Sequence, residues 1–339
     1  MRKPDFDKNI GAVLRKEAPA QPALFDFLLS LEAEAALSGV PLGATAEGSW
    51  LKRKILAYRN AGFDFVPLNA GGFHFTNGEH QSKDSRSMND GALITDRKSF
   101  GKYKWNEPED GCYDILDKEL PDGMKWMAVM PCGVLENVTF LTGYENLCYM
   151  LADDRELAEL IFKNVGERLV RYQKICSKYK NVGILMCNDD WGFNTGPLLA
   201  HSDLRELIFP YYKEVTATAH ANGQYCTMHS CGNFEGIYDE LYKVIGFDGK
   251  HSNEDLILPV EEAYRRYHKN IAILGGIDVD FLIRATPSEV EDRCKKMLKL
   301  SEKDGAYALG TGNSVANYVP LKNYFTLLKC ANPELRINA

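Results

Sequence analysis

Residues suited to acid–base chemistry and metal binding follow two consecutive predicted strands. The apolar stretch 182–187 is followed by Asp189 and Asp190, and the next predicted strand is followed by His229 and Cys231. A helical stretch separates the two strands, so they form consecutive β-α units. In parallel α/β folds, the residues after such strands meet at one edge of the sheet, where ligands bind. We therefore expect these four side chains to lie close together.

His229 and Cys231 alternate along the chain, so in extended backbone they share one face. Imidazole nitrogen and thiolate sulfur are ligands that Zn²⁺ accepts, and a catalytic zinc usually has three protein ligands and one open position. The pattern leaves the third ligand open among four residues: Glu254, Asp190, Cys187 and His251. The alternative is that His229 only hydrogen-bonds a buried carboxylate.

The adjacent pair Asp189 and Asp190 can supply only one carboxylate to the site, because neighbouring strand residues point to opposite faces. We choose Asp190, which precedes Trp191, as the acid or base. A carboxylate at this place can instead cap the following turn.

Short apolar stretches separated by helical ones recur along the chain and predict eight parallel strands. They are 23–27, 63–68, 126–130, 182–187, 225–228, 247–251, 271–274 and 307–309. Eight β-α units without repeats or linkers predict an α/β fold, a (β/α)8 TIM barrel, formed by one domain over residues 1–339. A doubly wound open sheet is the alternative, but neither G-x-G-x-x-G nor G-x-x-x-x-G-K-[ST] occurs.

The segment 69–123, after the second predicted strand, is too long for an ordinary β-α loop. It is rich in Gly, Asn, Asp and Ser. We interpret it as an insertion that forms a lid over the barrel or an interface between subunits, with a merely solvated insertion as the alternative.

Two helices carry clear boundary signals. Thr286 and Glu289 form a capping box around Pro287, which predicts the start of one helix. Asp203 is the predicted cap of another, in which Pro210 predicts a kink or a late start.

In a barrel, the mouth at the carboxyl ends of the strands would collect one set of polar side chains. The set comprises Asn69, Cys132, Asp189, Asp190, His229, Cys231, His251, Glu254, Asp278, Thr311 and Asn313. It contains strong metal ligands and general acids, which makes the mouth the predicted active site.

Composition argues against some classes of binding partner. The 40 basic and 47 acidic residues give a net charge of −7, which argues against nucleic acid or an anionic membrane as partner. The nine cysteines are scattered without a C-x-x-C pair, as expected of reduced thiols. We find neither a membrane-spanning apolar stretch nor a signal-peptide pattern, and expect a soluble cytoplasmic protein.

Several motifs together resemble the uroporphyrinogen decarboxylase superfamily, and within it the branch of cobalamin-dependent methyltransferases. They are Asp189-Asp190-Trp191-Gly192, His229-Ser230-Cys231-Gly232-Asn233, Gly275-Gly276-Ile277-Asp278 and Gly310-Thr311-Gly312. The resemblance covers most of the chain and implies a (β/α)8 barrel. It does not specify a substrate.

Two differences separate this chain from uroporphyrinogen decarboxylases themselves. Those enzymes carry an arginine-rich stretch after the first strand that holds carboxylates, whereas this chain has no arginine between that strand and Arg53. They also carry a late histidine where Thr311 stands here. Both differences favour the methyltransferase branch.

In that branch, the thiol-methylating members use the His and Cys of an H-x-C-G motif as zinc ligands, which matches His229 and Cys231. They add a late cysteine, again where Thr311 stands, and its absence favours members that demethylate methoxylated aromatics, methylamines or betaines. Such enzymes pass the methyl group to a corrinoid protein, so the resemblance implies Zn²⁺ in the enzyme and cobalamin in a partner.

The resemblance then assigns roles. The catalytic residues would be Asp190, His229 and Glu254, with His229 and Cys231 as metal ligands. The substrate-binding residues would be Asn69, Phe73, Trp191, Phe193, Asp278, Thr311 and Asn313. A homodimer is expected from the family. The alternatives are a decarboxylase of the kind found in porphyrin biosynthesis and a non-catalytic tetrapyrrole or corrinoid binder.

Overall fold

A curved sheet of seven parallel strands forms the centre of the computed structural model, which describes residues 2–78, 87–233 and 235–337. The strands, in spatial order, are β1 (Phe65–Leu68), β2 (Lys125–Val129), β3 (Val182–Asn188), β6 (Tyr225–His229), β7 (Gly249–His251), β8 (Ala272–Leu274) and β9 (Tyr307–Ala308). These confirm seven of the eight predicted strands. The order follows the sequence without reversal, unlike that of a doubly wound sheet.

The first predicted strand, 23–27, is the exception. It forms no ladder and touches the sheet through one parallel bridge, Leu24 to Leu309, with a second bridge from Leu29 to Val315. The side chain of Asp26 instead accepts hydrogen bonds from the backbone N and the Oγ1 of Thr311, at 2.8 and 2.7 Å. The hydrogen-bonded sheet of the described residues is therefore a half-barrel, with 23–27 lying beside β9.

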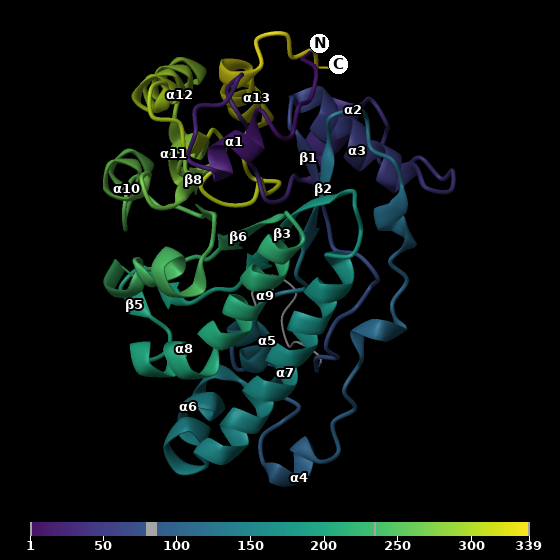
Figure 1. Ribbon diagram of the computed structural model, residues 1–339, viewed down its shortest axis with the longest axis vertical. Helices are drawn as coiled ribbons and strands as arrows, with labels where there is room; N and C mark the ends of the chain where they lie inside the picture. The colour runs from purple at the N-terminus through teal and green to yellow at the C-terminus, as the bar shows by residue number, and fades with distance from the viewer. Residues whose placement is uncertain (1, 79–86, 234, 338–339) are drawn as a thin grey trace.

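Helices surround the outer side of the sheet (Figure 1). They are α1 (Ile10–Leu14), α2 (Leu31–Ser38), α3 (Ser49–Ala61), α5 (Val134–Thr142), α6 (Tyr144–Asp153), α7 (Arg155–Cys176), α8 (His201–Leu207), α9 (Phe209–Ala221), α10 (Val260–Tyr267), α11 (Val279–Arg284), α12 (Pro287–Ser301) and α13 (Leu321–Ala331). A small hairpin, β4 (Gly192–Phe193) with β5 (Gly196–Pro197), follows β3. Single turns, η3 (Glu235–Ile237) and η4 (Leu241–Ile245), follow β6.

The helix signals had mixed outcomes. The capping box at Thr286 is confirmed, since its Oγ1 accepts from Glu289 N and its own backbone N donates to the Glu289 carboxylate. The cap at Asp203 was wrong. Helix α8 begins at His201, and Asp203 lies inside its first turn, where it binds Arg155 at 2.9 Å. Pro210 does force a late start, in the first turn of the separate helix α9.

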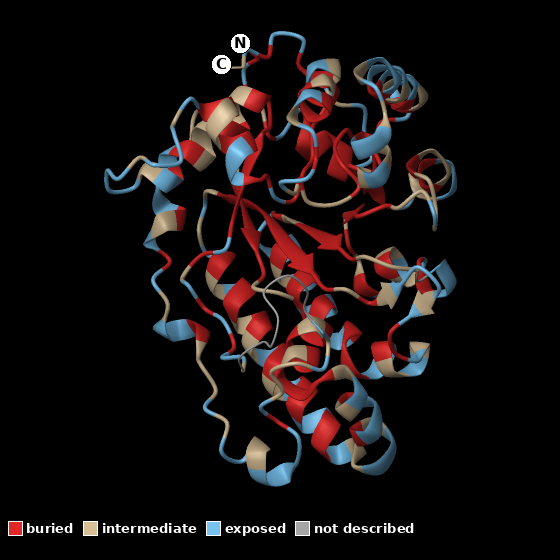
Figure 2. Ribbon diagram, turned by 180° about the vertical axis from the view of Figure 1, so that it is seen from behind, coloured by how far each residue is buried: buried red, intermediate tan, exposed pale blue. Residues whose placement is uncertain are grey.

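The core lies on both faces of the sheet. All seven residues of β3 are buried, as expected of a parallel strand covered by helices on one side and by the barrel interior on the other. Figure 2 shows the buried strands at the centre and exposed residues on the outer faces of the helices. This rigid centre fixes the positions of the strand ends.

The segment 69–123 contains only short elements in its described part: α4 (Arg97–Phe100), η1 (Pro108–Asp110) and η2 (Asp114–Asp117). Residues 79–86 lie outside the described residues. The segment is attached to α7, because Glu107 accepts from Arg168 at 2.5 Å and from Arg171 at 2.7 Å. Its role as a lid or an interface stays a prediction. In the described parts of the chain, no helix combines the length and the apolar character needed to cross a membrane.

Candidate active site

Asp190, His229 and Cys231 meet where β3 and β6 end. One ligand atom from each lies within 4.8 Å of the other two. His229 Nε2 is 3.6 Å from Cys231 Sγ, and Asp190 Oδ1 accepts a 3.0 Å hydrogen bond from the backbone N of Cys231. Oxygen, nitrogen and sulfur donors at these separations fit a zinc ion, which takes all three. Among the described residues, this is the one cluster of three such ligands.

The two aspartates differ because of strand register. Asn188 pairs with His229 across β3 and β6, so Asp189 and Asp190 lie beside the residues that follow His229. Asp189 is buried and accepts from Leu135 N, Glu136 N, Trp191 Nε1 and Tyr212 Oη, all between 2.7 and 2.9 Å. Its burial raises its pKa to about 6. Asp189 thus anchors the start of α5, while Asp190 faces the cysteine.

His229 is neutral in this environment. Its Nδ1 lies 2.8 Å from Nδ1 of His251, whose Nε2 lies 3.1 Å from the backbone O of Thr311. Burial lowers the pKa of His229 well below its usual value and that of His251 to about 3. The partner of His229 is therefore a second histidine, where a carboxylate had been the alternative.

Two donors surround the thiol of Cys231. Ser252 Oγ lies 3.5 Å and Asn313 Nδ2 3.3 Å from its sulfur. The amide of Asn313 is oriented by its Oδ1, which accepts from Ser314 N at 2.7 Å. Burial raises the pKa of the free Cys231 thiol to about 12. Two hydrogen-bond donors would stabilise the thiolate that a metal requires.

Three other candidates, Cys187, Asp278 and Thr311, direct their side chains to contacts outside the triad. Cys187 is buried against Cys226, with 3.8 Å between the sulfurs. Asp278 caps α11 by accepting from Phe281 N, and it also accepts from Asp255 N. The hydroxyl of Thr311 bonds Asp26, so only its backbone carbonyl is directed to the histidine pair.

A large pocket of about 740 Å³ opens beside the triad, at the ends of β1, β2 and β3. Asn69 and Phe73, two of the expected substrate-binding residues, line it, and their role stays a prediction. Phe27 also lines it and stacks on the ring of His229, with 4.7 Å between the centroids. Phe27 therefore connects the pocket to the triad. Phe27 and Asn188 line the pocket but had not been assigned to the site. The signal was available, because Phe27 is the last residue of the predicted strand 23–27 and Asn188 directly follows the predicted strand 182–187.

The two other aromatic candidates are placed differently from our expectation. Trp191 is fully buried, and its indole donates to Asp189 and packs on Phe209 and Tyr212. Phe193 is 49% exposed in the β4–β5 hairpin. Neither lines the large pocket.

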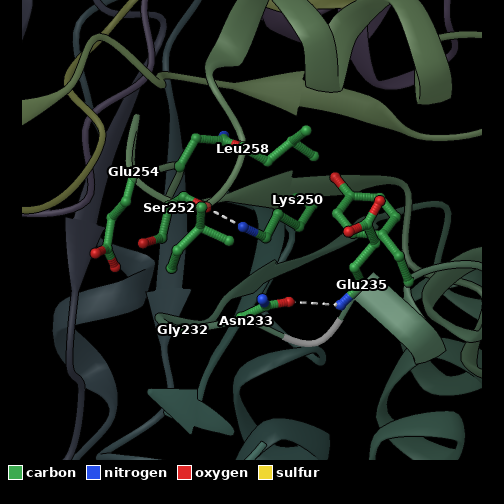
Figure 3. A pocket seen from close by; sticks show the side chains of 10 residues that line it. Gly232, Asn233, Glu235, Lys250, Ser252, Glu254 and Leu258 are labelled. Atoms are coloured by element: carbon green, nitrogen blue, oxygen red, sulfur yellow. Dashed lines mark hydrogen bonds between the residues drawn. The ribbon is translucent and has the colours of Figure 1, made fainter. Parts of the chain in front are cut away.

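A second, much smaller pocket of about 30 Å³ lies between the loops after β6 and β7 (Figure 3). Glu254 and the buried Lys250 line it, and Lys250 Nζ donates to the backbone O of Ser252. Burial lowers the pKa of Lys250 to about 8. Sequence reasoning missed Lys250, and the available signal was a lysine within a short predicted strand. Glu254 is placed in this pocket and is not a member of the triad.

Backbone strain marks the same edge of the sheet. Cys132, just after β2, has φ +59°, and Ser252, just after β7, has φ +81°. Non-glycine residues seldom adopt this region, and such strain is concentrated at functional sites.

Comparison with known families decides the relationship. Residues 113–333 match the model of the family described as Uroporphyrinogen decarboxylase (URO-D). The chain belongs to the uroporphyrinogen decarboxylase family. The resemblance seen in the sequence motifs is therefore confirmed at the family level. A search of curated proteins found no match.

Among solved structures, a methyltransferase from Methanosarcina mazei is similar over 95% of this chain and 97% of its own, with a TM-score of 0.68 and 14% identity. At this identity the likeness shows a shared fold. A protein from Listeria monocytogenes described as a vitamin-B12 independent methionine synthase aligns over 93% of this chain and 99% of its own, with a TM-score of 0.49 and 12% identity.

Proposed function

We propose that this member of the uroporphyrinogen decarboxylase family is a methyltransferase that moves a methyl group between a small methylated substrate and a corrinoid protein. The observation that carries the proposal is the Asp190–His229–Cys231 triad beside a 740 Å³ pocket. Its support from comparison is the fold shared with the methyltransferase from Methanosarcina mazei. We also propose that 23–27 takes the place of the eighth strand and closes the barrel, which the bridge from Leu24 to Leu309 supports.

The lining of the large pocket argues against a substrate with several carboxylates. Aromatic rings and the amides Asn69, Asn77, Asn137 and Asn188 line it, and the described lining contains no arginine. Its lysine, Lys54, is paired with Glu34 at 2.9 Å. Several carboxylates would need fixed guanidinium groups, so this pocket is unsuited to uroporphyrinogen. A methoxylated aromatic, a methylamine, a betaine or a methylated thiol suits it better.

Methyl transfer depends on placing the methyl carbon in line with its acceptor and on improving the leaving group. Phe27 and Phe73 exclude water and hold the apolar part of the substrate beside His229. Asp190 Oδ, His229 Nε2 and Cys231 Sγ would hold the metal ion, which supplies Lewis-acid stabilisation of the departing oxygen, nitrogen or sulfur. Ser252 and Asn313 keep the thiolate of Cys231 in place through their donors.

The first test is metal content, measured by plasma mass spectrometry on protein purified without chelator. We expect about one zinc per chain in the wild type and none in Asp190→Ala, His229→Ala or Cys231→Ala, because three protein ligands are the usual minimum for a catalytic zinc. Cys148→Ala is the matched control, since Cys148 is an exposed thiol on α6, and it should keep the metal. A metal-free wild type would contradict the zinc site.

The second test is turnover. Each class of methylated donor is incubated with a reduced corrinoid acceptor, and methylation is followed by absorbance. Methylation that is lost in the triad variants would support the proposal. Release of carbon dioxide from a carboxylated substrate would instead identify a decarboxylase, and tight corrinoid binding without turnover would identify a binder.

A further inference from the structure

The buried ring of His251 connects the candidate ligand His229 to the backbone of Thr311. His251 has no exposed surface, and its two nitrogens have one partner each. Nε2 lies 3.1 Å from the carbonyl O of Thr311, and Nδ1 lies 2.8 Å from Nδ1 of His229. Because a carbonyl oxygen can only accept, Nε2 of His251 carries a hydrogen.

The contact between the two Nδ1 atoms holds a single proton, because two N–H groups cannot point at each other over 2.8 Å. A doubly protonated His251 would place a positive charge on a ring with no exposed surface, and burial disfavours a charged group. His251 is therefore neutral, with a bare Nδ1. The shared proton belongs to Nδ1 of His229.

This assignment decides the state of the other nitrogen of His229. Neutral imidazole carries one hydrogen, so His229 Nε2 is left with a lone pair. That nitrogen lies 3.6 Å from Cys231 Sγ, inside the triad. A metal binds only a nitrogen without hydrogen, so the hydrogen-bond pattern selects the tautomer that can bind one.

The packing around the two rings supports a fixed arrangement. Phe27 stacks on His229, and the ring of Phe25 lies 5.2 Å from that of His251. Gly275, with φ +66°, leaves room for the bond to Thr311. A Cβ at Gly275 would lie 2.3 Å from the O of Thr311 and 3.0 Å from Nε2 of His251.

We propose that His251 is a positioning residue: held by the carbonyl of Thr311, it fixes His229 as the Nδ1–H tautomer and so presents Nε2 to a metal before the metal arrives. The proposal rests on the metal site of the proposed function. The hydrogen-bond relay, however, belongs to the metal-free protein and can be tested there. Hydrogen-bond partners of a metal-binding histidine typically raise metal affinity by about 10- to 100-fold.

The test measures the tautomer of His229 and the affinity of the protein for zinc. Metal-free protein labelled with ¹⁵N-histidine is studied by two-bond ¹H–¹⁵N correlation spectra, with His229→Ala identifying the signals. Zinc affinity is measured by competition with a chelator. We expect Nδ1–H for His229 in the wild type and a mixture of tautomers in His251→Phe. We also expect zinc binding about 10- to 100-fold weaker in His251→Phe.

Two further variants separate positioning from packing. His251→Gln keeps one donor for Thr311 and one acceptor for His229, so it should restore most of the affinity and the tautomer. Phe25→Leu changes the packing on His251 but none of its hydrogen bonds, and it should bind zinc like the wild type. Circular dichroism melting checks that each variant folds.

The outcomes are distinguishable. An Nε2–H tautomer of His229 in the metal-free wild type would overturn the relay, even if His251→Phe failed to fold. Unchanged tautomer and affinity in His251→Phe would also overturn it. A wild type with the Nδ1–H tautomer that binds no zinc would contradict the metal site of the proposed function and confirm the relay alone.

Discussion

At the carboxyl ends of the strands, some side chains stabilise the fold and others belong to the candidate site. Adjacent residues can differ in this respect. Asp189 satisfies four donors in the core, whereas Asp190 completes the triad. A second buried carboxylate, Asp26, accepts from Thr311 and from Tyr324 Oη at 2.8 Å. Burial raises the pKa of Asp26 to about 6, despite these bonds. This shift has a measurable consequence for stability.

Asp26 should make the protein less stable as the pH rises from about 4 to above 6. Its pKa is higher in the folded state than the unfolded value of about 3.9, so the folded state binds more protons in that window. The stability it contributes is complete below about pH 4 and is lost as pH rises through about 6. Relative to Asp26→Asn, the wild type should lose on the order of 3 kcal/mol of unfolding free energy.

Urea denaturation at pH 4 and pH 7 measures this difference between the two proteins. Other carboxylates, including Asp189, titrate in both proteins and therefore cancel. If the two proteins differ in unfolding free energy by the same amount at pH 4 and at pH 7, Asp26 keeps an ordinary pKa.

Residue types and alternation predicted that His229 and Cys231 share a face, because strand periodicity assigns a face, but they left the third member of the cluster open among four residues. They could not predict partners. Trp191 follows Asp190 directly, yet its indole turns inward to Asp189, since a buried indole N–H needs an acceptor. Lys250 was missed because alternation does not reveal which lysine within a strand is buried.

At the scale of elements, apolar stretches predicted seven strands to within two residues at each end. The segment 23–27 has the same apolar character but only bridges to β9, because the Asp26 side chain occupies the backbone N of Thr311. The start at Thr286 was predictable from its capping box with Pro287. The same spacing of Asp203 and Glu206 was misleading, because α8 begins at His201 and both carboxylates bind Arg155 instead.

Thr286→Ala should destabilise the protein by about 1 kcal/mol, because the first turn of α12 loses the acceptor for Glu289 N. Thermal or urea unfolding measures the change. Ser288→Ala, two residues into the same helix and also exposed, is the matched control and should cost nothing, since alanine favours helix interiors. Equal losses in both variants would argue against the capping box.

Across the whole molecule, many contacts attach the segment 69–123 to the rest of the fold, among them the packing of Phe73 and Tyr113 on Tyr172, and Arg168 adds a half-buried ion pair. Its guanidinium binds Glu107 and covers the ring of Trp105, 5.0 Å from the centroid. It is only 11% exposed, unlike the other cations of α7 that form ion pairs.

Arg168→Ala should loosen the described part of this segment without unfolding the barrel. We expect about fivefold faster amide hydrogen exchange in residues 97–113, which corresponds to about 1 kcal/mol of local stability. Mass spectrometry of peptic fragments measures it. Lys174 lies on the same helix as Arg168. Lys174→Ala removes its exposed ion pair with Glu214 of α9 and should leave exchange unchanged. Equal exchange rates in the wild type and Arg168→Ala would exclude this attachment.

The hydrogen bonds of the mouth join residues at very different separations along the chain, and this has a consequence for the order of folding. Asp190 and Cys231 are 41 residues apart, His251 and Thr311 are 60 apart, and Asp26 and Thr311 are 285 apart. Closing a longer loop costs more chain entropy and slows the search. During synthesis, the triad residues at the ends of β3 and β6 can meet while Thr311 is still untranslated. The bond that Asp26 accepts from Thr311 must await the translation of Thr311, so the residues of the triad can meet before 23–27 joins the sheet.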